Sequence, residues 1–178
     1  GITYDKSEYT VTVTISDKGD GSLDVSHQVS GKGTSLDFSN NYEATGSLVL
    51  TGNKTLTGRN LRPGEFSFAL YSGSTAEGTP LATVTNDSSG NFSFPAQIYT
   101  LDDLGRKTYT VIEQEGTLQG VTYDTGQYTV TVDISDQGDG KLVVSPTVTG
   151  KGEALNFTNS YEAAGSLTLT GSKSLIGR

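Results

Sequence analysis

Apolar and polar residues alternate along most of this chain, which is the pattern of strands with one buried face. The clearest run is residues 128–134, where Tyr, Val and Ile alternate with Thr and Asp. Clusters of Gly, Asn, Asp, Ser and Pro separate the runs and predict turns. No segment of useful length has the apolar spacing of a helix. Within one domain, the pattern predicts strands near residues 46–51, 65–71, 81–86, 91–94, 108–114, 127–135, 141–149 and 154–160.

The number and spacing of these strands predict an all-β fold. Roughly seven to nine short strands joined by turns are typical of an antiparallel β-sandwich of immunoglobulin-like type. A domain of about 115 residues is long enough to bury one hydrophobic core. We therefore expect a sandwich whose core is formed by the apolar faces of these strands.

An internal repeat sets the domain boundaries. Residues 1–59 align with residues 120–178 without a gap, at an offset of 119, and 38 of the 59 aligned positions are identical. A period of this length is that of a whole domain. We expect residues 1–44 to be the C-terminal part of a preceding repeat, 45–162 a complete domain, and 163–178 the first strand of a following repeat. The chain would then be an excerpt from a longer tandem array.

Composition excludes several classes of function. The chain has no Cys, which removes disulfides, thiol chemistry and cysteine-ligated zinc, and its single His makes a catalytic triad improbable. The net charge of −8, with no basic cluster, makes nucleic acid and anionic membranes poor partners. No apolar run approaches the ~18 residues of a membrane span. We expect no cofactor and no metal.

Three polar residues lie where strand alternation places the buried face. Side chains alternate between the two faces of a strand, so residues two apart share a face. Lys54 follows Leu48 and Leu50 on such a face, Glu113 follows Tyr109 and Val111, and Asn159 follows Leu155 and Phe157. A base, an acid and an amide on three strands indicate a buried polar cluster.

Burial gives such a cluster a specific chemistry. Desolvation lowers the pKa of a lysine and raises that of a glutamate, so a buried pair can become a neutral amine and a neutral acid. A neutral amine is a nucleophile, and a protonated carboxyl can polarise an amide and transfer protons. Lys54 could then displace ammonia from Asn159 and form a covalent side-chain amide. Alternatively, Gly52 ends the first strand and releases Lys54 to solvent, and Asn159 caps a turn.

Other residues offer weaker candidates. Glu115 shares a face with Glu113 and is the alternative catalyst, although it lies nearer a loop. The segments 17–21 (DKGDG) and 136–140 (DQGDG) resemble calcium loops, but they lack a distal bidentate acid, so we interpret them as turns. We expect Glu65, His27, Lys32 and Lys151 on the solvent-exposed surface.

Five motifs carry a resemblance to a known family. Residues 52–61 (GNKTLTGRNL) and 64–68 (GEFSF) resemble the opening of the isopeptide domains of Gram-positive pilins. Residues 109–113 (YTVIE) are similar to their glutamate strand, and residues 120–124 (GVTYD) to the segment that follows it. Residues 157–161 (FTNSY) are similar to their closing strand. The family comprises repeats of streptococcal backbone pilins and related surface adhesins with CnaB-like folds.

The resemblance implies a fold, a bond and a location. It implies a CnaB-type sandwich in which Lys54 and Asn159 join spontaneously and Glu113 catalyses that single turnover, so the domain is not otherwise an enzyme. It implies a structural stalk module of a cell-surface adhesin or pilus, made inextensible by the bond. The protein would be extracellular and attached to the cell wall through parts outside this segment. The alternative is an adhesive domain that binds a host protein or glycan.

The two partial repeats lack a complete reactive set. Asn40 is equivalent to Asn159 but has no preceding lysine strand, and Lys173 is equivalent to Lys54 but has no following asparagine strand. We expect both to remain unlinked. The expected partners are neighbouring repeats of the same protein, and the open strand edges also allow head-to-tail pairing between chains.

Overall fold

The computed structural model describes residues 1–177, and almost all regular structure within them is β. The exception in this range is one 3₁₀ turn, η1 (Leu101–Asp103). The described residues divide into two compact units. The first contains Gly1–Ser47, Ile98–Gly105 and Ile134–Val144, and the second contains Leu48–Gln97, Arg106–Asp133 and residues 145–177. No helix in the described range is long and apolar enough to cross a membrane.

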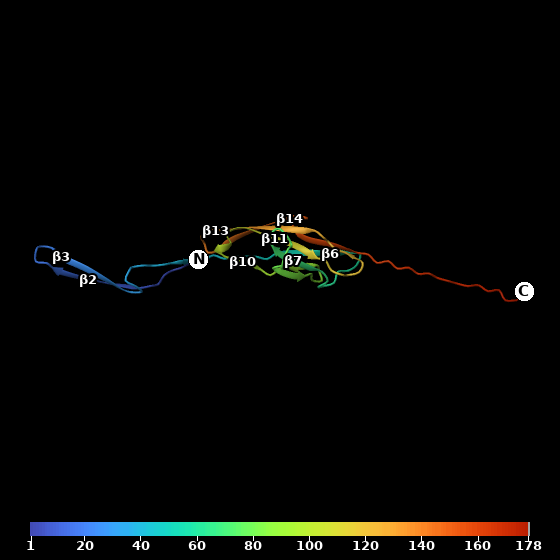
Figure 1. Cartoon of the computed structure of the whole chain (residues 1–178), viewed down its shortest axis with the longest axis horizontal. Helices are drawn as coiled ribbons and strands as arrows, with labels where there is room; N and C mark the ends of the chain where they lie inside the picture. Colours follow the sequence, from blue (N-terminus) through green and yellow to red (C-terminus); the bar gives the residue numbers. More distant parts are fainter. Residues whose placement is uncertain (178) are drawn as a thin grey trace. The chain divides into compact units, whose positions relative to one another are not determined.

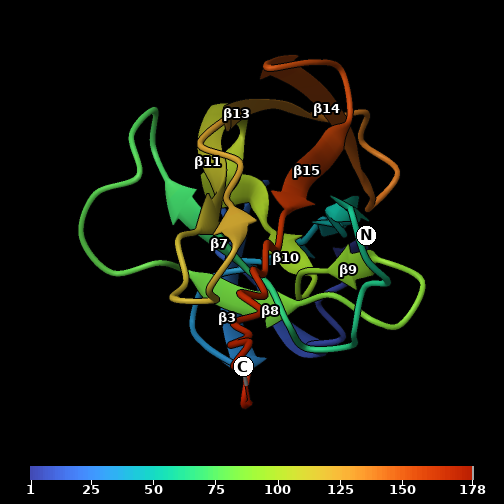
Figure 2. The ribbon, with the colours of Figure 1, turned by 90° about the vertical axis from the view of Figure 1, so that its right-hand side faces the viewer.

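Two sheets form the hydrophobic core within residues 45–162. One has the order β14 (Leu142–Gly150), β13 (Gln127–Asp136), β11 (Gly105–Gln114), β7 (Ser67–Ser72) and β8 (Ala82–Thr85). The other has the order β12 (Val121–Thr122), β15 (Leu155–Tyr161), β6 (Thr51–Thr57) and β9 (Asn91–Ser93). In Figure 2, β7, β11 and β13 lie to the left of β9 and β15.

Aromatic side chains join the two sheets. Phe68 of β7 stacks on Phe92 of β9, with ring centroids 3.9 Å apart, and also contacts Phe157 of β15 at 5.2 Å. Tyr128 of β13 meets the Phe157 ring edge-on at 5.1 Å. All four rings are buried, so burial of apolar surface between the sheets stabilises this packing.

The expected strands are present, but one of them is divided and three short elements were not predicted. The first strand is divided into β5 (Gly46–Leu48), which pairs with β10 (Gln97–Tyr99), and β6, which pairs with β9 and β15. The strands β10 and β12 and the turn η1 were not predicted. They are too short for alternation to reveal them.

The prediction of a fully antiparallel sandwich is wrong at one pair. Strands β15 and β6 are parallel, with Phe157 opposite Lys54 and Asn159 opposite Leu56. The pairing is close because Gly52 has no side chain; a Cβ at this position would collide with the Phe92 ring and the Leu155 carbonyl oxygen. Gly52 therefore continues the strand instead of ending it. The first and last long strands of the domain run side by side in the same direction.

The N-terminal segment, residues 1–44, contains two pairs of strands. Its strands are β1 (Ile2–Thr3), which pairs with β4 (Asn41–Tyr42), and the hairpin of β2 (Tyr9–Asp17) and β3 (Leu23–Gly31), coloured blue in Figure 1. Val11, Val13 and Ile15 are exposed here, whereas their equivalents in β13 are buried. The apolar positions of the same sequence pattern are therefore exposed in β2 and buried in β13. Residues 162–177 contain no strand.

Candidate functional site

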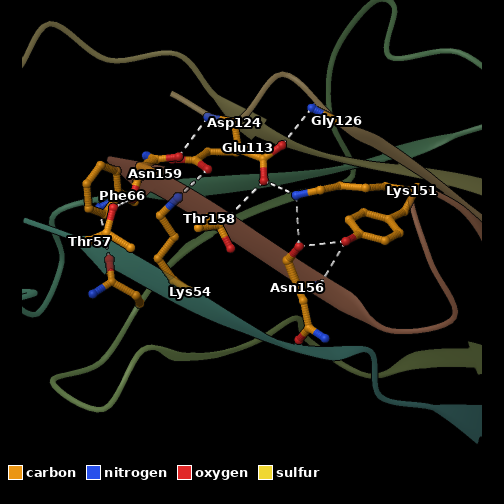
Figure 3. A network of polar contacts seen from close by, with 12 residues as sticks. Lys54, Thr57, Phe66, Glu113, Asp124, Gly126, Lys151, Asn156, Thr158 and Asn159 are labelled. Carbon is orange, nitrogen blue, oxygen red and sulfur yellow. Dashed lines mark hydrogen bonds and ion pairs between the residues drawn. The ribbon is translucent and has the colours of Figure 1, made fainter. Parts of the chain in front are cut away.

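Three strands bring Lys54, Glu113 and Asn159 together in the core of the second unit. Lys54 lies in β6, Glu113 in β11 and Asn159 in β15 (Figure 3). The exposed fractions are 2% for Lys54, 6% for Glu113 and 1% for Asn159, so none of these side chains reaches bulk water. The parallel register of β6 and β15 and the facing sheet that contains β11 produce this convergence.

Glu113 lies between the other two side chains. Lys54 Nζ donates to Glu113 Oε2 at 2.6 Å, and Asn159 Nδ2 donates to Glu113 Oε1 at 2.6 Å. Each carboxylate oxygen therefore faces one of the two nitrogens that would be exchanged in the proposed reaction. Glu113 can accept a proton from the amine and supply one to the amide nitrogen without moving to a new position.

Burial changes the protonation of the pair. Desolvation lowers the pKa of Lys54, and the hydrogen bond that Lys54 donates to Glu113 opposes this only in part. Desolvation likewise raises the pKa of Glu113 against the hydrogen bonds from Lys54 and Asn159. Both shifts favour the neutral amine and the neutral acid. The Phe66 ring, whose centroid lies 4.6 Å from Lys54 Nζ, is a further part of the apolar wall and was not predicted.

The oxygen of the Asn159 carboxamide has its own partner. The backbone N–H of Asp124 donates to Asn159 Oδ1 at 2.7 Å. Asp124 Oδ2 accepts the Thr158 N–H at 2.8 Å and also pairs with Lys151 Nζ. Burial tends to raise the pKa of Asp124, but the Lys151 ammonium and the backbone N–H donors outweigh it and lower that pKa.

One expectation of surface exposure is wrong. Lys151 and Lys32 are exposed as predicted, although each also pairs with a carboxylate, Lys151 with Asp124 and Lys32 with Asp5 at 2.7 Å. Glu65, in contrast, is not on the solvent face. Its side chain is 8% exposed and forms a two-pronged ion pair with Arg59. The Asp124–Lys151 pair could have been noticed in the sequence, since both residues recur at the repeat offset as Asp5 and Lys32.

The remaining candidates lie away from the cluster. Glu115 is exposed and lies beyond the end of β11, whereas Glu113 contacts both partners. His27, Asn40 and Lys173 are exposed. Asn40 Oδ1 accepts the Asp5 N–H at 3.0 Å.

The two loops that resemble calcium sites fold as turns. The N–H of Gly19 bonds to Asp17, and that of Gly138 to Asp136. Asp136 also accepts the Tyr42 hydroxyl at 2.8 Å. Within residues 1–177, no group of three His, Cys, Asp or Glu side chains is arranged to hold a metal ion.

Comparison with known structures finds similar proteins. The major pilin from Streptococcus pyogenes is 24% identical, with a TM-score of 0.41 over 65% of this chain and 50% of the pilin chain. The major pilin T-13 from a second serotype is 21% identical, with a TM-score of 0.45 over 67% of this chain and 54% of the pilin chain. This chain therefore matches about half of each pilin's length. None of the curated protein sequences compared matches it significantly.

Family assignment rests on a sequence model and not on these structural scores. The model of the Spy0128-like isopeptide containing domain, FctA, matches residues 1–43 and 50–162. These two segments contain every strand of the described structure except β5. The chain belongs to the family of Spy0128-like isopeptide containing domains.

Proposed function

We propose that this chain is a structural shaft segment of a pilus or pilus-like surface protein, stapled internally by a Lys54–Asn159 amide. Membership of the isopeptide domain family supports this role, and so does the resemblance of the domain to pilins. The single observation that carries the bond is the buried contact of Glu113 with both the amine and the carboxamide. On this proposal the sandwich is of CnaB type, the repeats are arranged in tandem, and the protein is extracellular.

The proposed reaction is an exchange of one amide nitrogen for another. The neutral amine of Lys54 attacks Cγ of Asn159, forming the Nζ–Cγ bond. Glu113, which begins as the neutral acid, gives its proton to Nδ2, and its carboxylate then takes the proton that Nζ loses. The Cγ–Nδ2 bond breaks, and Nδ2 leaves as ammonia. Glu113 ends in the protonation state in which it began. The reaction occurs once per chain, so the domain has no turnover and needs no cofactor.

The site favours this exchange by position and by excluding water. The reacting groups are held on three paired strands, which removes most of the entropic cost of bringing them together. Their near-complete burial excludes water, the nucleophile that would otherwise compete for the carboxamide. Burial also lowers the pKa of Lys54, which favours the neutral amine.

The proposed partners are neighbouring repeats. The exposed apolar face of β2–β3 is equivalent in sequence to the buried face of β13–β14, so strands of a preceding repeat would cover it in a longer chain. The alternative, a role in binding a host ligand, rests on the sandwich scaffold alone. No contact described above favours it.

A digest of the folded protein tests the proposal. We expect a branched peptide that joins the Lys54 segment to the Asn159 segment, and its mass should be one ammonia below the sum of the two peptides. The control is the Lys54→Met variant, which has no nucleophile and should give two separate peptides. Unmodified Lys54 and Asn159 peptides from the folded parent chain would refute the bond.

A further inference from the structure

The loop between β12 and β13, which contains Asp124, holds the strand that carries Asn159. The carboxylate of Asp124 accepts the Thr158 N–H on Oδ2 and the Gly126 N–H on Oδ1, both at 2.8 Å, and pairs with Lys151 (Figure 3). The side chain of Asp124 is 7% exposed, so these contacts are largely shielded from water. With its carboxylate fixed in this way, the backbone N–H of Asp124 points at Asn159 Oδ1.

This backbone donor meets the atom on which charge would develop. When an amine adds to a carboxamide, the electrons of the C=O double bond move to the oxygen. Hydrogen-bond donors already aimed at that oxygen stabilise the transition state, because they need no reorganisation during the reaction. The N–H of Asp124 is 2.7 Å from Oδ1, and Glu113 accepts from Nδ2 on the other side. The two contacts fix which way the carboxamide is turned.

The same arrangement occurs a second time, without the other reactants. In residues 1–44, the N–H of Asp5 donates to Asn40 Oδ1 at 3.0 Å, and the carboxylate of Asp5 accepts the N–H groups of Ser39 and Ser7, each at 2.9 Å. Lys32 pairs with Asp5 at 2.7 Å. Each of these contacts is displaced by 119 residues from its counterpart around Asp124. The arrangement therefore forms in a segment that has neither a reactive lysine strand nor a glutamate strand.

We propose that the loop at Asp124 orients the Asn159 carboxamide for attack: its backbone N–H binds the developing oxyanion, and the Asp124 carboxylate and Lys151 act as positioning groups. This inference rests on the proposed Lys54–Asn159 reaction. As Nζ bonds to Cγ, negative charge develops on Oδ1 and is held by the Asp124 N–H. The charge returns to the carbonyl as the Cγ–Nδ2 bond breaks and ammonia leaves.

The decisive test removes a single hydrogen-bond donor, the backbone N–H of Asp124. The full chain is assembled from segments under denaturing conditions, so that it is unlinked until the denaturant is diluted, and the loss of ammonia is then followed by intact mass. An amide-to-ester replacement at residue 124 keeps the carboxylate and removes only the N–H. We expect linkage to slow by roughly 100-fold to 1,000-fold. Linkage at the parent rate would overturn the role of the N–H.

Side-chain variants test the positioning groups. Asp124→Ala should slow linkage on the order of 100-fold, because the carboxamide is no longer held in the reacting geometry. Asp124→Asn and Lys151→Met should have smaller and equal effects, and Lys151→Arg should restore the rate. The matched control is Asp5→Ala, which disrupts the equivalent loop of the partial repeat and should leave the rate unchanged. Parent-rate linkage in both Asp124→Asn and Lys151→Met would refute the role of the ion pair.

A spectroscopic readout separates positioning from a general loss of stability. In the unlinked Lys54→Met chain, the Asp124 amide proton should be protected from solvent exchange, and adding Asn159→Ala should remove that protection while neighbouring amides of β15 keep theirs. An Asp124 amide that exchanges freely in Lys54→Met would overturn the inference. A parent chain that never loses ammonia would instead refute the proposed function, so the two failures are distinguishable.

Discussion

Replacing Lys54 by methionine removes the proposed nucleophile and keeps a side chain of similar length in the core. The buried hydrogen bond between Asn159 and Glu113 does not involve Lys54 and should persist, so we expect a folded but unlinked domain. The variant then reports what the bond does under tension. In a longer chain, force enters the domain at the start of β6 and leaves it at the end of β15.

The parallel pairing of β6 and β15 determines how the domain resists a pulling force. Six residue pairs, from Gly52 with Leu155 to Thr57 with Ser160, are in register along β6 and β15. Pulling the start of one strand against the end of its parallel neighbour loads all of these pairs in shear. With the Lys54–Asn159 bond in place, tension passes from strand to strand, and the chain between the two residues cannot lengthen. Without it, rupture of the pairing releases that chain.

The released length follows from the sequence. Asn159 is 105 residues after Lys54. At ~3.3–3.6 Å per residue, the fully extended segment spans roughly 350–380 Å. The folded distance to be subtracted is small, because Lys54 is opposite Phe157 on the adjacent strand. Single-molecule stretching should therefore show one step of approximately this length in Lys54→Met and none from the parent domain.

The control for this experiment is Lys173→Met, which changes the equivalent lysine of the partial repeat and should behave like the parent. The same long step in the parent chain and in Lys54→Met would refute the mechanical role, even if the bond is present.

Further predictions can be checked by measuring the loss of ammonia and by looking for covalent oligomers. Glu113→Ala should slow linkage by about 10²–10⁴-fold, because proton transfer is lost, whereas the exposed Glu115→Ala should link at the parent rate; intact mass against time after refolding measures both. The rate should have a bell-shaped pH profile, because the amine of Lys54 is protonated at low pH and Glu113 has no proton to give at high pH. Asn40 and Lys173 should stay unlinked, and a ladder of covalent oligomers on a denaturing gel would contradict this.

Alternation along the strands predicted that three polar side chains are buried. Lys54, Glu113 and Asn159 each continue an apolar face by steps of two residues, and all three are buried in the structure. The prediction succeeded because a half-buried strand imposes a strict period on its side chains. The same period could not establish which strands are neighbours. The parallel pairing of β6 with β15 depends on contacts between residues about 100 positions apart, which no local pattern reveals.

Alternation could not predict the ion pairs of Asp124 and Glu65. Asp124 and Lys151 lie in turns, where alternation gives no information, and a lysine between two glycines is usually solvated. Their pairing depends on the turns meeting in space. Strand alternation places Glu65 on the solvent-facing side, yet its side chain is covered by Arg59. In both pairs a cation shields a carboxylate, that of Asp124 or Glu65, from water, and the local sequence does not reveal this.

The intact mass of the folded parent chain tests the central claim most directly. The account predicts a mass one ammonia below that calculated from the sequence, and the full calculated mass for Lys54→Met after allowing for the substitution. A parent chain at its full calculated mass, in a preparation shown to be folded, would contradict the account.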